Sequence, residues 1–217
     1  IGSLTLGSTM ASRFPVQAKA GLLVSLANVL AVCVENALNK VRIERVGLTD
    51  ALTGVANKKY MMRRLEEETA RCKRSAEPMA CLFIEIDDFD DLSTRYGRRA
   101  ADESLISLAD IVGAQLRGSD TVARFEGATF AVLLVRSSPK DSGFVADRIR
   151  EVVSERTFDC EGQAMPVSIS IGVAALRGDS DKTLPRNIAD RLCDEAANAL
   201  KIAAHAEGNK VISAVLN

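Results

Sequence analysis

The spacing of hydrophobic positions changes several times along this chain, and each spacing indicates a type of element. Continuous or alternating apolar residues are typical of strands, whereas apolar residues three and four positions apart are typical of helices. We expect strands at 1–8, 79–86, 121–125, 130–135, 165–176 and 211–216. We expect helices at 18–45, 58–74, 100–116, 139–155 and 188–206. This order predicts that residues after 47 form one α/β unit, with a strand hairpin among alternating helices and strands.

The first 46 residues have a different character. IGSLTLGS at 1–8 predicts a single strand, which needs a partner strand in another chain or in sequence outside this one. The helix predicted at 18–45 carries a coiled-coil-like seam, which predicts a homodimer, although the same pattern fits a helix packed on its own domain. The seam residues are Leu30, Val34, Ala37, Val41 and Leu48.

Composition excludes several classes of protein. The chain has 217 residues, of which 47% are hydrophobic and 26% charged, with a formal net charge of −1. This balance argues against a general nucleic-acid or membrane-surface binder, and the absence of Trp argues against a base-stacking platform. The apolar run at 21–34 is interrupted by Ser25 and Asn28 and is too short for a membrane span, and no signal peptide is recognised. Five cysteines without a C-x-x-C pair indicate a reduced, cytoplasmic protein.

The most informative stretch is RGSDTVARFEGATF at 117–130. Arg117 and Asp120 form an Arg-x-x-Asp pair before a predicted strand hairpin. A guanidinium holds its donors in one plane, which suits phosphate groups and guanine edges. A turn that bound metal for phosphoryl chemistry would carry acids, but Ala128 and Thr129 stand in this turn. The stretch therefore predicts nucleotide binding without the catalytic groups.

Residues 48–217 resemble the GGDEF-type diguanylate cyclase domain. The resemblance rests on motifs that occur in one order: DALTGVAN at 50–57, EIDDF at 85–89, Tyr96-Gly97, Arg117 with Asp120, Arg124, Phe130, SISIGV at 168–173, Ala199-Leu200 and Asn209. It implies an α/β, nucleotidyl-cyclase-like palm with a mainly antiparallel central sheet flanked by helices, over residues 47–217. Residues 1–46 resemble the last strand of a GAF-like sensor domain running into a signalling helix.

The family makes cyclic di-GMP from two GTP molecules with two metal ions, and this chain departs from the residues that the resemblance assigns to that reaction. The family signature G-G-(D/E)-E-F reads Glu126, Gly127, Ala128, Thr129 and Phe130 here. Elsewhere Glu85 replaces a metal-binding aspartate, and Ala204 replaces a phosphate-binding lysine. Ser93 replaces the guanine-reading asparagine, although its partner residue in the family is kept as Asp102. Phosphoryl transfer depends on such positioned charges, so we expect no metal site and no cyclase activity.

Two other features carry no predicted chemistry. The acidic stretch at 87–91 lacks the spacing of a calcium loop, and we interpret it as a solvated loop. His205, the one histidine, has no cysteine or acid four residues away and is not expected to bind metal or act as a base.

A regulatory site is implied by the resemblance. In the family, cyclic di-GMP docks on Arg-x-x-Asp with help from an arginine on the following helix, and Arg148 stands at that position here, eighteen residues after Phe130. We predict that Arg117, Asp120 and Arg148 bind this ligand and lie on the surface. An alternative interpretation of Arg117 and Asp120 is a surface ion pair of small energy. Two alternative functions stay open: a structural or dimerisation module that binds no nucleotide and signals only through the helix at 18–46, and an active cyclase of divergent signature.

Overall fold

The computed structural model describes residues 27–35, 47–160, 163–177 and 187–216. The chain separates into two units, Ile1–Gly47 and Leu48–Asn217. Residues 27–35 of the first unit are helical and their side chains are exposed. The strand predicted at 1–8 and most of the helix predicted at 18–45 lie outside the described residues. Within the described ranges, no helix has the length and hydrophobicity needed to cross a membrane.

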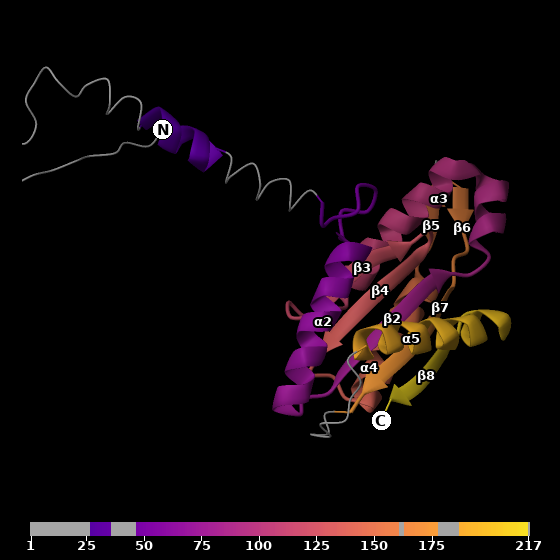
Figure 1. Cartoon of the computed structure of the whole chain (residues 1–217). Coiled ribbons are helices and arrows are strands. Elements are labelled where there is room, and N and C mark those ends of the chain that lie inside the picture. Colours follow the sequence, from indigo (N-terminus) through magenta and orange to yellow (C-terminus); the bar gives the residue numbers. More distant parts are fainter. Residues whose placement is uncertain (1–26, 36–46, 161–162, 178–186, 217) are drawn as a thin grey trace, which may run out of the picture. The chain divides into compact units, whose positions relative to one another are not determined.

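The second unit is built around a six-stranded sheet with the order β1-β3-β4-β2-β7-β8 (Figure 1). The strands are β1 (Ala56–Asn57), β2 (Met79–Ile86), β3 (Thr121–Glu126), β4 (Thr129–Val135), β7 (Ile169–Leu176) and β8 (Val211–Leu216). The inner pairs β3–β4, β4–β2 and β2–β7 are antiparallel, whereas the outer pairs β1–β3 and β7–β8 are parallel. The predicted palm with a mainly antiparallel sheet is confirmed.

Helices cover both faces of this sheet. They are α2 (Lys58–Ser75), α3 (Phe89–Ala114), α4 (Pro139–Glu155) and α5 (Ile188–His205). Helices α3 and α4 pack on one face, and α2 and α5 pack on the other. Successive side chains of a strand point to opposite faces, so Leu82 joins the first core and Cys81 the second. Because both faces are covered, β2 is apolar along almost its whole length.

Helix α5 lies very close to β7. A Cβ atom built on Gly172 would be 2.1 Å from the carbonyl oxygen of Ala196 and 2.2 Å from the backbone nitrogen of Leu200. The glycine in the SISIGV motif is therefore required by this close approach of strand and helix.

Three parts of the prediction were wrong in detail. Helix α3 begins at Phe89, eleven residues earlier than the predicted 100, so Asp90 and Asp91 lie in its first turn. The helix dipole favours acids in a first turn. The start of α3 was missed because Gly97, which kinks the helix with a φ of 86°, interrupts the helical pattern of the sequence. A small hairpin of β5 (Phe158–Cys160) and β6 (Gln163–Met165) was not predicted, and it separates residue 165 from β7.

Candidate functional site

A cavity of about 1000 Å³ opens beside the end of β2, the start of α3 and the turn between β3 and β4. Six of the positions that the resemblance assigned to the cyclase reaction line it: Glu85, Ser93, Asp102, Gly127, Ala128 and Ala204. These positions are far apart in the sequence, and the sheet together with α3 and α5 brings them around one space. The cavity is therefore the place where the family's chemistry would occur.

The β3–β4 turn directs its side chains to different places. Ala128 lines the large cavity, whereas Glu126 and Thr129 line a second cavity of about 510 Å³ beside α2 and α5. The Glu126 carboxylate lies 3.2 Å from the Lys58 Nζ at the start of α2, so it is held by that lysine. Phe130 is fully buried in the core beneath α3 and α4. The signature thus keeps the phenylalanine that anchors it in the core, but the two positions before it, Ala128 and Thr129, carry no carboxylate.

Carboxyl groups dominate the large cavity. Besides Glu85 and Asp102, its lining includes Asp87, Asp88, Asp90, Asp91 and Glu207. Burial raises the pKa of the Glu85 carboxyl; a hydrogen bond with the Thr129 side chain opposes this, and the negative charges of Asp87 and Asp90 add to it. Like charges collected in a half-buried space repel a further anion such as a triphosphate.

The donor groups do not fit the two metal ions that the family uses. The Ala128 side chain has no oxygen to offer, and across the described residues no group of three or more His, Cys, Asp or Glu side chains is arranged to hold a metal ion. Arg124, a cation in the cavity wall, is occupied because its Nε donates to the Gly127 carbonyl at 2.8 Å and its Nη1 to Asp50 at 3.3 Å. The signature turn therefore adds no Ala128 carboxylate for Mg²⁺, and Arg124 is already held by Gly127 and Asp50.

Asp87 has a structural role, which corrects the interpretation of 87–91 as a solvated loop. Its carboxylate accepts hydrogen bonds from Ser168 Oγ and Ser170 Oγ, both at 2.6 Å, and from the backbone N–H of Asn209 at 2.8 Å. Gly208 has a φ of 68°, and a Cβ atom there would lie 2.8 Å from the Asp87 carboxyl carbon. Asp87 therefore joins the end of β2 to β7 and to the residues before β8.

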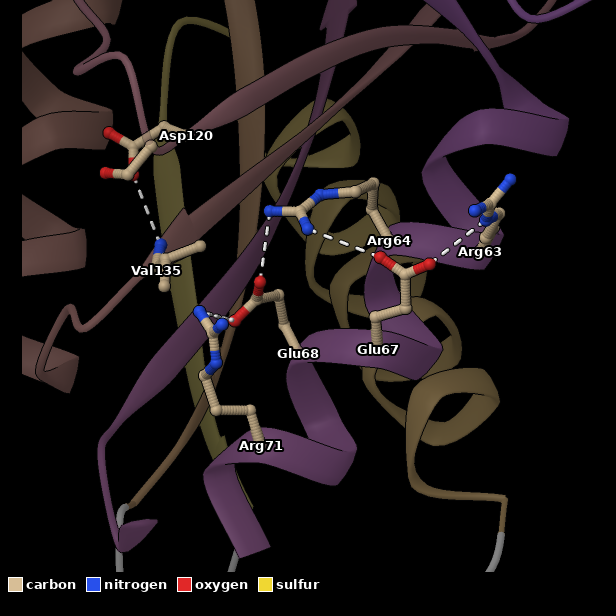
Figure 2. Close-up of polar contacts among 8 residues, drawn as sticks. Arg63, Arg64, Glu67, Glu68, Arg71, Asp120 and Val135 are labelled. Carbon is tan, nitrogen blue, oxygen red and sulfur yellow. Dashed lines mark hydrogen bonds and ion pairs between the residues drawn. The ribbon is translucent and has the colours of Figure 1, made fainter. Parts of the chain in front are cut away.

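The Arg-x-x-Asp turn lies between α3 and β3. One oxygen of Asp120 accepts the backbone N–H of Arg117 at 3.0 Å. The other accepts the backbone N–H of Val135 at 3.2 Å, as Figure 2 shows. Among the described residues, the guanidinium of Arg117 makes no ion pair with Asp120. The alternative of a surface ion pair is therefore wrong, and the expectation that Asp120 is a plain surface residue needs correction. Asp120 is half-buried and organises the turn, whereas Arg117 is exposed.

Arg148 lies beside this turn. It stands on α4, and its Nη2 donates to the carbonyl of Gln115 at 2.7 Å. Gln115 caps the C-terminus of α3, two residues before Arg117, and carbonyl groups at a helix end need such donors. Arg148 is exposed, as expected. The structure thus places the predicted ligand residues Arg117, Asp120 and Arg148 around the end of α3.

A buried ionic cluster on α2 was missed. Glu68 is only 6% exposed, and Arg64 at 3.0 Å and Arg71 at 3.5 Å bind its two carboxylate oxygens (Figure 2). Glu68, Arg71 and Val135 line one small crevice, so the cluster lies close to the strand end that Asp120 holds. The spacing of these charges on a helix was readable in the sequence, but their burial depends on the sheet beneath.

Comparison of the sequence with known proteins identifies the family of this chain. Residues 47–210 match the family described as diguanylate cyclase, GGDEF domain. The chain belongs to the GGDEF family. Diguanylate cyclase A of Treponema denticola is 31% identical over 183 residues, covering 82% of this chain and 48% of that protein. The response regulator PleD of Caulobacter vibrioides is 33% identical over 138 residues, covering 63% of this chain and 30% of that protein. This chain therefore spans less than half the length of these relatives.

Solved GGDEF structures have the same fold. The coiled coil and GGDEF domain of DgcB from Caulobacter crescentus, in complex with c-di-GMP, gives a TM-score of 0.79 over 89% of this chain and 99% of that chain. Its 22% sequence identity supports the fold alone. The GGDEF domain of YfiN from Pseudomonas aeruginosa is 30% identical, with a TM-score of 0.68 over 76% of this chain and 99% of that chain.

Proposed function

We propose that this GGDEF domain is a cyclic di-GMP receptor without cyclase activity, which relays ligand occupancy through its N-terminal helix. The observation that carries the proposal is the placement of Arg148 beside the Arg-x-x-Asp turn, through its bond to Gln115. Two exposed arginines at the end of α3 provide planar donors for phosphate oxygens and for the Hoogsteen edge of guanine. DgcB, which has the same fold, is known in complex with this ligand.

The proposed absence of cyclase activity is supported by the signature turn and the large cavity. In the signature turn, Ala128 and Thr129 stand in place of the two acids of the family. The wall of the large cavity, which Ala128 lines, is rich in carboxylates. The relatives named as diguanylate cyclases share the fold, so the difference in activity would come from these side chains. Because phosphoryl transfer relies on metal ions and positioned cations, the cavity does not support turnover of GTP.

One observation favours a second function, that of a structural or dimerisation module that binds no nucleotide. Both carboxylate oxygens of Asp120 are already used by backbone N–H groups, which accounts for this aspartate without a ligand. The two functions differ in what they predict for Arg117. In the structural module its guanidinium has no task, whereas in the receptor it is a principal ligand contact.

Two assays on the same preparation test the proposal. Incubation with GTP and either Mg²⁺ or Mn²⁺ should yield no cyclic di-GMP above a blank without protein. A thermal-shift titration with cyclic di-GMP should raise the melting temperature, because a ligand at a hundredfold excess over its dissociation constant adds about 2.7 kcal/mol of stability. Sustained turnover would contradict the first part, and an unchanged melting temperature would favour the structural module.

A further inference from the structure

The outer face of α4 carries an aromatic ring between two cations. Lys140, Phe144 and Arg148 are spaced by four residues, so they lie along one side of the helix, and all three are exposed. The opposite side faces the core beneath α3 and α4, and its buried residues are Ser142, Ala146, Ile149 and Val153. Packing of α4 on the sheet therefore does not use Phe144.

The exposure of Phe144 is unusual for this chain. The ring is 62% exposed, while every other aromatic side chain among the described residues is buried or half-buried. The composition argued against a base-stacking platform, but one exposed ring is sufficient to stack on one base. Among the described residues, Phe144 is thus the one aromatic ring that is open to a flat ligand.

Phe144 stands on the same side of α4 as Arg148, the residue that contacts the end of α3. Arg148 is one helical turn away, about 6 Å along the axis, and it bonds to Gln115 next to the turn that carries Arg117. On the other side, Lys140 Nζ lies 5.7 Å from the centre of the Phe144 ring.

We infer that Phe144 is a stacking surface for one guanine base of the cyclic di-GMP bound by Arg117 and Arg148, an inference that rests on the proposed function. A base presents a flat, weakly polar face, and covering a phenyl ring with it removes apolar surface from both partners. The arginines contact phosphates and base edges, and Phe144 contacts the base face. Lys140, whose ammonium group lies over the same ring, would then provide a flexible cation for a phosphate oxygen of this ligand.

The test uses a property of the sequence. The chain contains no tryptophan, so Phe144→Trp introduces a single indole that reports on this position alone. Cyclic di-GMP should quench this fluorescence at saturation, with the dissociation constant that calorimetry gives for the same variant. Phe144→Ala should weaken binding roughly five- to a hundredfold, the range found when stacking rings are removed. The matched controls are Ile202→Ala and Ile202→Trp on α5, an exposed site that is 59% accessible and belongs to the other face of the sheet. Both variants should bind cyclic di-GMP with the affinity of the parent. The indole fluorescence of Ile202→Trp should not change when the ligand is added.

The outcomes separate this inference from the proposed function. If the parent binds and Arg117→Ala weakens binding while Phe144→Ala does not, the stacking role is wrong and the receptor stands. If Phe144→Trp is not quenched although calorimetry shows binding, the stacking role is again overturned. If the parent does not bind cyclic di-GMP at all, the proposed function fails and the inference fails with it. Quenching together with loss of affinity in Phe144→Ala supports it.

Discussion

The carboxylate of Asp120 accepts the backbone N–H of Val135 across the open end of the β3–β4 hairpin, at 3.2 Å. Its second oxygen accepts the backbone N–H of Arg117 at 3.0 Å, so one side chain fixes both the hairpin end and the turn before it. Asp120 therefore has a structural task in addition to the ligand contact that we propose for it.

Asp120→Ala should lower the free energy of unfolding by about 1–3 kcal/mol, because two backbone N–H groups lose their charged acceptor. Urea denaturation measures the change. Arg117→Ala is the matched control, since it keeps the backbone N–H and removes an exposed side chain, and it should change stability by less than about 0.5 kcal/mol. Equal stability of the two variants would show that the Asp120 contacts contribute nothing.

Arg148→Ala should reduce affinity for cyclic di-GMP roughly tenfold, since one charged hydrogen bond to the ligand is lost. Arg148→Lys should recover little, because an ammonium group cannot reproduce a planar pair of donors. The control is Arg98→Ala in the large cavity, whose side chain is 93% exposed, and calorimetry should find its affinity unchanged. An effect at Arg98 and none at Arg148 would move the binding site to the large cavity.

Glu85→Gln should stabilise the protein near neutral pH. Burial raises the pKa of Glu85 in the folded state, helped by Asp87 and Asp90 and opposed by Thr129. The folded state then holds the proton more tightly than the unfolded state, so stability from this group is present at low pH and is lost as pH rises through its unfolded and then its folded pKa.

The glutamine in Glu85→Gln does not ionise, so it does not lose stability as the pH rises. Melting temperatures of Glu85→Gln and the parent should therefore differ most near about pH 7 and converge toward about pH 4. Glu155→Gln, an exposed position on α4, should differ little from the parent at either pH. A difference for Glu85→Gln that is the same at both pH values would contradict the account of this carboxyl.

The N-terminal unit should make the protein a homodimer, because the helix predicted at 18–45 has an apolar seam. Light scattering on the whole chain should give twice the monomer mass. A fragment starting near Gly47 should give the monomer mass, because Leu48–Asn217 is a compact unit of its own. A monomer in both measurements would refute this expectation.

Much of the fold could be predicted because long apolar patterns leave few choices. The strand β2 matches the predicted range because both of its faces are buried and its apolar run ends at Asp87. The start of α3 was missed because Gly97 interrupts the helix with a positive φ. The strands β5 and β6 have three residues each, too few for an alternating pattern to stand out.

The candidate site was predictable in part. Motif order identified the residues around the large cavity, and counting from Phe130 identified Arg148. The contacts of Asp120 and the direction of Glu126 could not be read from the sequence. Each depends on a residue brought close by folding, Val135 for the first and Lys58 for the second.

Calorimetric titration of cyclic di-GMP into the parent and into Arg117→Ala tests the central claim most directly. The account predicts saturable binding to the parent and a loss of affinity of roughly ten- to over a hundredfold in the variant, because a planar charged contact is removed. Ala128→Ser, in the degenerate turn, should bind like the parent, and cyclic di-AMP should bind more weakly than cyclic di-GMP. If Arg117→Ala binds cyclic di-GMP as tightly as the parent, the Arg-x-x-Asp surface is not the receptor site and the account is contradicted.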